Sequence, residues 1–129
     1  MTEAEYISQI RQRIREEGRI FNDSFDLLRA ALAEYPDSPS LWCLRGDMIQ
    51  LSDEDAGCSL DDVLPSYEKA LDLDPNCGEA YESIGYFYDK VLDAPAIAEA
   101  YFRTALERGG GESAARGLRD VVEELKGTP

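Results

Sequence analysis

The residue types that enzymes use for catalysis are scarce in this chain of 129 residues. Histidine, the commonest general base, is absent, and no Gly-x-Ser-x-Gly, phosphate-loop or dinucleotide-binding motif occurs. The glycines at 109–111 lack the Lys-Ser or Lys-Thr that follows a phosphate loop, so we interpret them as a turn between helices. With 27 acidic residues, paired carboxylates are expected by chance. The sequence therefore predicts a protein that is not an enzyme and binds no cofactor.

One acidic segment has the alternating oxygen ligands of a calcium-binding loop. Residues 53–61 contain the pattern Asp-x-Asp-x-Gly-x-Ser-x-Asp. Cys58, however, stands where such a loop needs glycine for its sharp turn, and Leu64 takes the place of the bidentate glutamate. We interpret the segment as a solvated acidic loop. A metal-responsive module built on it is an alternative that a calcium titration would test.

Cysteine chemistry is limited as well. Cys43, Cys58 and Cys77 make an odd count without C-x-x-C spacing. Without histidine, the usual zinc ligand sets cannot be completed. We predict reduced thiols and no metal site.

Size and charge narrow the classes of partner. The length and the 43% of hydrophobic residues fit one compact domain with a real core. The net charge is −14, and residues 37–99 carry 15 acidic against 3 basic side chains. Such a surface repels nucleic acid and anionic membranes, and it fits either a basic partner or a solvated acidic face. No apolar run reaches membrane-spanning length and the first residues lack a secretory pattern, so we expect a cytoplasmic protein.

Helical spacing and capping residues predict seven helices and no strand, which makes the fold class all-α. Thr2 and Glu5 form a capping box before the first helix, and Gly18 ends it. Ser38 and Pro39 supply the cap and the first residue of the third helix. The first three helices are expected at about 3–17, from the cap Asp23 to Pro36, and at 39–51. The fourth is expected at 62–74 with Asp61 or Asp62 as its cap, and the fifth at 78–91 with Asn76 as its cap. The sixth runs from Asp93-Ala94-Pro95 to the glycines at 109–111, and the seventh, which Ser113 begins, covers about 112–126.

Self-similarity appears at the helix ends. Three of them share an Ala-Leu pair followed by a helix breaker, and a glycine recurs 15 residues after the first two of those alanines. Two landmarks therefore keep the same register, which is typical of a repeat protein. The landmarks are Ala31-Leu32 with Pro36, Ala70-Leu71 with Pro75, Ala105-Leu106 with Gly110, and the glycines Gly46 and Gly85.

The last of these repeats has the motif of a known family. Residues 81–88 contain Tyr-x-x-Ile-Gly-x-x-Tyr, and Ala98, Phe102 and Ala105 follow. This segment resembles the tetratricopeptide repeat, whose pattern is W-x-x-L-G-x-x-Y, then A-x-x-x-F, A and P. The preceding repeat is looser, since it keeps the tryptophan, glycine, alanine and proline but has Arg45 at the leucine position.

The resemblance implies a right-handed superhelical stack of about three helix pairs with a C-terminal capping helix. Small residues would let two antiparallel helices approach closely while large aromatic residues fill the groove between pairs. We expect one domain over residues 1–129. It would contain a degenerate repeat at 3–36, a repeat at 38–75 with an inserted acidic loop at 52–61, and the best-matching repeat at 77–110. A capping helix at 112–126 would follow, with the apolar face Ala115, Leu118, Val122 and Leu125. The aromatic residues expected in the core are Trp42, Tyr67, Tyr81, Tyr88 and Phe102.

In the resembled family, the first helix of each repeat lines an inner surface that grips peptides or helices. The residues that would line it here make an acidic surface, whereas family members that clamp an acidic chaperone C-terminus use Lys, Arg and Asn. We therefore exclude that partner class. The candidate partner-binding groove contains Cys43, Asp47, Gln50, Glu79, Glu82, Ser83, Tyr86 and Asp89.

These observations favour a non-catalytic adaptor or partner-specific chaperone that binds a basic or amphipathic segment of another protein. An alternative from a different class is an acidic inhibitor, of immunity type or mimicking nucleic acid, that blocks the basic site of a toxin or nuclease. An adaptor would use the groove, whereas a mimic would use its whole acidic surface.

Overall fold

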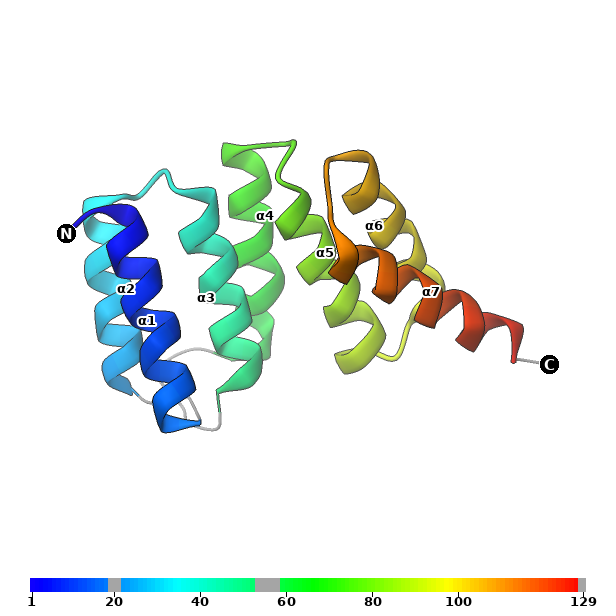
Figure 1. Cartoon of the computed structure of the whole chain (residues 1–129), viewed down its shortest axis with the longest axis horizontal. Coiled ribbons are helices and arrows are strands. Elements are labelled where there is room, and N and C mark those ends of the chain that lie inside the picture. The colour runs from blue at the N-terminus through cyan, green and yellow to red at the C-terminus, as the bar shows by residue number, and fades with distance from the viewer. Residues whose placement is uncertain (19–21, 53–58, 128–129) are drawn as a thin grey trace. The chain divides into compact units, whose positions relative to one another are not determined.

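The computed structural model describes residues 1–18, 22–52 and 59–127, and this part of the chain contains helices and their connections without any strand (Figure 1). The predicted all-α class is thus confirmed. The segment η1 is a 3₁₀ turn, and η2 is a π-helical continuation of α5. The elements are α1 (Glu3–Glu17), α2 (Asn22–Glu34), α3 (Pro39–Leu51), η1 (Leu60–Asp62), α4 (Val63–Leu73), α5 (Gly78–Tyr86), η2 (Phe87–Val91), α6 (Pro95–Glu107) and α7 (Glu112–Lys126).

The helices form two compact units, Met1–Leu73 and Asp74–Pro129. In the first unit, α1 packs on α2 and α3 packs on α4, while in the second unit α6 packs on both α5 and α7. The paired helices run antiparallel (Figure 1). This is the helix pairing expected from the repeat pattern, whereas a single domain with a right-handed stack stays a prediction.

Several predicted helix ends are confirmed in atomic detail. The Thr2 hydroxyl accepts a hydrogen bond from the Glu5 amide (3.1 Å), and the Glu5 carboxylate accepts one from the Thr2 amide (2.9 Å). Gly18 ends α1 with a φ of 71°, a left-handed conformation that suits glycine. At the start of α3, the Ser38 hydroxyl accepts from the Leu41 amide. Capping chemistry therefore defines these ends as the sequence predicts.

Two predicted caps are wrong because their side chains lie inside the helix or bond elsewhere. The helix α2 already includes Asp23, whose carboxylate accepts from the Arg13 guanidinium at 3.2 Å. The residue before α5 is Cys77, and the Asn76 side chain accepts from Arg108 instead. The helix α7 spans Glu112–Lys126 as predicted, and it begins one residue before Ser113.

The start of α4 also differs from the prediction. Neither Asp61 nor Asp62 caps it, because the 3₁₀ turn η1 precedes it. The cap belongs to Ser59, whose hydroxyl accepts from the Asp61 amide, while the Asp62 carboxylate accepts from the Ser59 amide at 2.8 Å. The two acidic residues thus close a reciprocal capping box in front of the helix.

Each unit contains a close contact between a glycine and an aromatic ring of the facing helix. A Cβ atom added at Gly46 of α3 would lie 2.5 Å from the Tyr67 ring of α4. One added at Gly85 of α5 would lie 2.8 Å from the Phe102 ring of α6, and one at Gly117 of α7 would lie 2.5 Å from the same ring. Both rings are fully buried. The rings therefore occupy the space that the glycines leave open.

The other aromatic residues expected in the core are only half-buried. The indole of Trp42 donates to the Pro36 carbonyl, and the ring of Tyr88 stacks on Tyr101 with centroids 5.5 Å apart. The hydroxyl of Tyr81 donates to the Pro75 carbonyl. These rings lie at the edge of their units, where polar atoms can reach backbone partners.

The buried stripe of α7 is displaced by one residue from the predicted face. Ala114, Gly117 and Val121 are buried, whereas the predicted Ala115, Leu118, Val122 and Leu125 are half-buried. Gly117 explains the shift, because α7 can approach the Phe102 ring only along the side that bears no side chain.

We expect Gly85→Leu to lower the free energy of unfolding by about 1–3 kcal/mol, because a side chain there would overlap the buried Phe102 ring. Urea unfolding of the full chain measures this change. The control is Gly127→Leu, where an added Cβ would meet its nearest atom at 3.6 Å and the position is exposed. Equal unfolding free energies for the two variants would contradict the close approach.

Candidate functional site

The eight predicted groove residues are divided between the two units. The first unit contributes three residues of α3, and the second contributes four residues of α5 and one of η2. Their assembly into one groove stays a prediction. The residues are Cys43, Asp47 and Gln50 in the first unit and Glu79, Glu82, Ser83, Tyr86 and Asp89 in the second.

In the first unit, a buried tyrosine organises the predicted residues. The Tyr67 hydroxyl donates to Asp47 Oδ1 (2.5 Å) and accepts from Gln50 Nε2 (2.6 Å). Asp47 and Gln50 are three residues apart on α3, so one hydroxyl of α4 can reach both. Cys43, one turn earlier, is fully buried. The surface contribution of this half is therefore a carboxylate and an amide that Tyr67 orients.

In the second unit, α5 presents an acidic face. Glu79, Glu82, Ser83 and Tyr86 lie at helical spacing, which places them on one side of the helix. Glu79 is exposed, and the others are half-buried. We call these four residues the α5 face. The Glu79 side chain lies at the surface, where a charged partner can reach it.

Tyr86 has a structural role within this unit. Its hydroxyl donates to the Ser113 carbonyl in the first turn of α7 at 2.6 Å. Its ring meets Phe102 edge to face, with centroids 4.8 Å apart and an angle of 76°. Such aromatic pairs stabilise a core beyond the area that they bury. Tyr86 therefore ties α5 to α6 and α7.

Asp89 does not present its carboxylate to a partner. Its side chain is only 2% exposed, and Lys90 Nζ lies 3.2 Å from its Oδ2 atom. The contact has the geometry of an ion pair, with the lysine head in water and the carboxylate inside. The sequence suggested an exposed position because helical spacing continues the α5 face, but the residue lies in the π-helical segment η2. There the helix widens and the register of the face changes.

A second carboxyl group lies close to Asp89. Partial loss of hydration raises the pKa of the Glu124 carboxyl on α7, and repulsion from the Asp89 carboxylate raises it further. The hydrogen bond and charge of Asp89 raise the pKa of Lys90. The Glu124 carboxyl therefore holds a proton more readily when the unit is folded than when it is unfolded.

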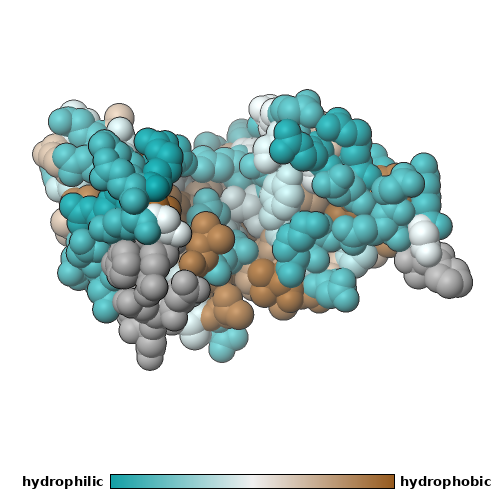
Figure 2. Space-filling view, turned by 60° about the horizontal axis from the view of Figure 1, so that its bottom comes forward, coloured by the Kyte–Doolittle hydropathy of each residue, from teal (hydrophilic) through white to brown (hydrophobic). Residues whose placement is uncertain are grey.

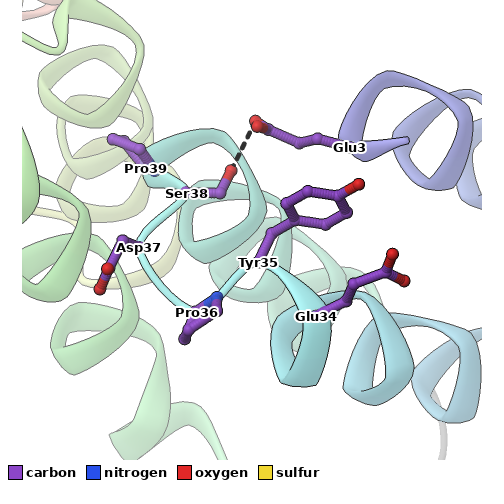
Figure 3. A pocket seen from close by; sticks show the side chains of 7 residues that line it. All are labelled: Glu3, Glu34, Tyr35, Pro36, Asp37, Ser38 and Pro39. Carbon is purple, nitrogen blue, oxygen red and sulfur yellow. Dashed lines mark hydrogen bonds between the residues drawn. The ribbon is translucent and has the colours of Figure 1, made fainter. Parts of the chain in front are cut away.

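The sequence did not indicate a pocket of about 340 Å³ in the first unit, where α1 meets the connection between α2 and α3. Figure 3 shows that Ser38 points toward Glu3, and the hydroxyl donates to that carboxylate at 2.7 Å. The sequence signal was a Pro-Asp-Ser-Pro connection that we interpreted only as a helix stop and a cap. The lining residues are Glu3, Glu34, Tyr35, Pro36, Asp37, Ser38 and Pro39.

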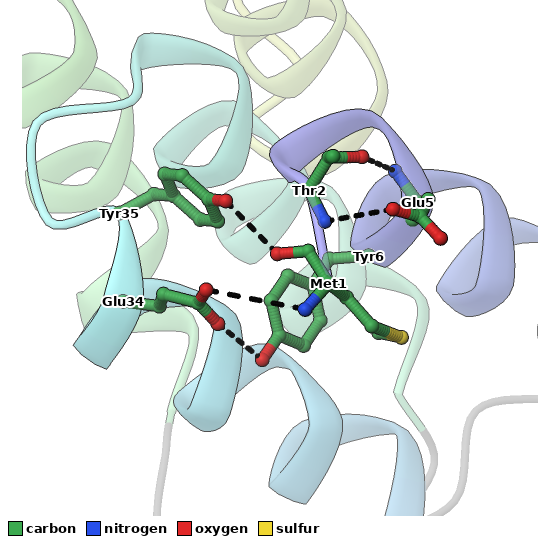
Figure 4. Close-up of polar contacts among 6 residues, drawn as sticks. All are labelled: Met1, Thr2, Glu5, Tyr6, Glu34 and Tyr35. Carbon is green, nitrogen blue, oxygen red and sulfur yellow. Dashed lines mark hydrogen bonds and ion pairs between the residues drawn. The ribbon is translucent and has the colours of Figure 1, made fainter.

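The Glu34 carboxylate at this pocket already has partners within the unit (Figure 4). Glu34 accepts from the Tyr6 hydroxyl at 2.7 Å, which raises the pKa of Tyr6, and it lies 4.0 Å from the amino group of Met1. The Tyr35 hydroxyl donates to the Met1 carbonyl at 2.9 Å. These contacts join the start of α1 to the end of α2, so the polar groups here serve the helix pair.

Metal binding finds no support in the part of the chain that the structure describes. Within it, no group of three or more potential metal-ligating side chains is arranged to hold an ion. The calcium-like pattern falls mostly on residues 53–58, outside the described residues, together with Cys58. In the described ranges, no helix has both the length and the apolar character needed to cross a membrane.

We expect Tyr67→Phe to lower the free energy of unfolding by about 1–3 kcal/mol, because Asp47 would lose a charge-assisted hydrogen bond from a buried hydroxyl. Urea unfolding measures the change. Tyr81→Phe is the control, since its hydroxyl bonds to a carbonyl beside water. If both variants lose the same stability, Tyr67 does not organise the α3 residues.

We expect Glu124→Gln to stabilise the protein at pH 7 and to leave it unchanged near pH 3. The raised pKa means that the Glu124 carboxyl stabilises the fold when protonated, below its unfolded pKa of about 4.5. That contribution is lost as the pH rises through the folded pKa. Melting temperatures across pH 3–8 test this, with the exposed neighbour Glu123→Gln as control. The same pH profile for both variants would contradict the coupling to Asp89.

Comparison with known proteins shows the fold. The chain matches no protein-family model, and a sequence search of curated proteins also finds no match. Among solved structures, it is similar to the crystal structure of the Sgt2 TPR domain from Aspergillus fumigatus, with a TM-score of 0.74 and 18% sequence identity. The match covers 96% of this chain and 79% of the other. The fold is therefore that of a tetratricopeptide-repeat domain.

Proposed function

We propose that this chain is a non-catalytic interaction module of the cytoplasm, an adaptor or partner-specific chaperone that binds a basic or amphipathic segment of another protein. The acidic α5 face is the observation that carries the proposal. Repeat folds of this kind present extended surfaces on the first helices of their pairs. The predicted site joins this face to Asp47 and Gln50 on α3.

The carboxylates of the α5 face act mainly on the rate of association. Glu79 is exposed and Glu82 is half-buried, so both stay partly hydrated and are screened by salt. Charges of this kind steer a basic partner and select against acidic ones, and they add less to the lifetime of the complex. On the first unit, the hydroxyl of Tyr67 fixes Asp47 before binding. A preoriented carboxylate loses less side-chain freedom when the partner arrives.

Tyr86 is an unsuitable position for testing binding, although an aromatic residue at the centre of a face is a common hot spot. Its hydroxyl donates a hydrogen bond to a carbonyl of α7, and its ring packs on Phe102. Removing the side chain would change stability and binding together. Charge reversal on α5 is the cleaner test.

We expect Glu79→Lys/Glu82→Lys to slow association with the natural partner about tenfold and to leave dissociation nearly unchanged. The partner is first captured with the parent chain from the native cell and identified by mass spectrometry. Binding rates are then measured by surface plasmon resonance at low and physiological salt. Glu107→Lys/Glu123→Lys is the control, because it makes the same change in net charge at exposed positions of α6 and α7.

The control also separates the two function classes. An acidic inhibitor or nucleic-acid mimic would use the whole acidic surface, so both double variants would slow association equally. An adaptor would be slowed only by the change on α5. Unchanged binding of both variants would contradict both functions.

A further inference from the structure

An apolar patch lies at the turn between η2 and α6. Val91, Leu92 and Ile97 are 40%, 49% and 48% exposed, and they fall within seven residues of each other. Figure 2 shows apolar side chains gathered in patches on a surface that is otherwise mostly hydrophilic. Single apolar side chains on a surface need no explanation, but a cluster rimmed by polar groups indicates an interaction site. We call these three residues the turn patch.

The backbone holds this turn in one tight conformation. The Ala94 amide donates to the Tyr88 carbonyl at 2.8 Å, and the Leu92 amide donates to the Phe87 carbonyl at 3.1 Å. Asp93 has a φ of 50°, at the position after a helix end where glycine is usual. The patch is therefore presented on a closed turn, so binding would require little ordering of the backbone.

Acidic residues lie in and near the turn that carries the patch. Asp93 is exposed within the turn itself, and the Glu124 carboxyl lies close enough to it for the two charges to interact. Lys90 is the basic group among them, and it is already paired with Asp89. The rim of the patch is thus net negative.

We propose that the turn patch is a second docking site, which receives the apolar face of an amphipathic, basic helix from another protein. Apolar side chains of the helix would cover Val91, Leu92 and Ile97, and its lysine or arginine side chains would meet Asp93 and Glu124 at the rim. A second copy of this chain is disfavoured, because it would bring the same acidic rim and a net charge of −14. The proposal does not depend on the α5 face.

The test uses the full chain and a fluorescein-labelled synthetic helical peptide with leucine on one face and lysine on the other. Fluorescence anisotropy gives the dissociation constant. We expect Val91→Ser/Leu92→Ser/Ile97→Ser to weaken binding at least about tenfold, since three apolar contacts are lost. The matched control is Leu51→Ser/Leu60→Ser, which removes exposed leucines (68% and 52%) from the first unit. It should change binding less than about twofold.

Charge is tested separately with Asp93→Asn/Glu124→Gln. Asparagine accepts the left-handed conformation, so the turn is kept while two charges are removed. This variant should bind the lysine peptide about threefold more weakly and with less dependence on salt. A peptide with glutamate in place of lysine should bind the parent chain at least about tenfold more weakly than the lysine peptide does.

Four binding results would overturn the proposal. The first is that the lysine peptide does not bind the parent chain, and the second is that the triple variant binds it as tightly as the parent does. The third is that the leucine control variant weakens binding as much as the triple variant does. The fourth is that the glutamate peptide binds the parent as tightly as the lysine peptide does. Sedimentation of the parent and the triple variant tests whether a second copy of this chain occupies the patch instead. Dimerisation of the parent alone would assign the patch to a second copy and overturn the proposal as well. Binding by the α5 variant Glu79→Lys/Glu82→Lys should equal that of the parent, so failure of this site is distinguishable from failure of the α5 face.

Discussion

The contact between a glycine on one helix and an aromatic ring on the next is the constraint on which the rest of the structure depends. In the first unit, the Tyr67 ring fills the space beside Gly46, and in the second unit the Phe102 ring fills the space beside Gly85. Each ring is fully buried and leaves no room for a side chain opposite. Sliding either helix along its partner would put a larger residue against the ring, so the contact fixes the register of the pair.

The same contact positions the candidate binding residues. Asp47 directly follows the first glycine, and Tyr86 directly follows the second. Asp47 accepts the Tyr67 hydroxyl, whereas Tyr86 packs on the Phe102 ring, which has no hydroxyl, and sends its own hydroxyl to α7. Equivalent positions in two repeats thus serve different purposes. Asp47 presents a charge that the Tyr67 hydroxyl orients, whereas Tyr86 binds the last helix, α7, to its unit.

The sequence predicts the helices well because caps, breakers and small residues act locally, and the register of Gly46, Gly85 and their partner rings is visible as spacing. It could not predict the site to the same extent. The burial of Asp89 depends on the π-helical segment, where one extra residue in a turn changes the facing of every residue after it. The hydroxyl that binds Asp47 and Gln50 comes from another helix, so no spacing within α3 reveals it. The role of Ser59 was hidden because its segment resembled a metal-binding loop.

The connection between facing helices is free to vary in length once the glycine and the ring have met. Gly46 and Tyr67 are 21 residues apart, whereas Gly85 and Phe102 are 17 apart, and the contact is formed in both units. Closing a longer connection costs little entropy, since each doubling of its length adds only about 0.6 kcal/mol. Evolution can therefore lengthen the segment at 52–61, or an engineer can graft a recognition sequence into it, without repacking the helices on either side.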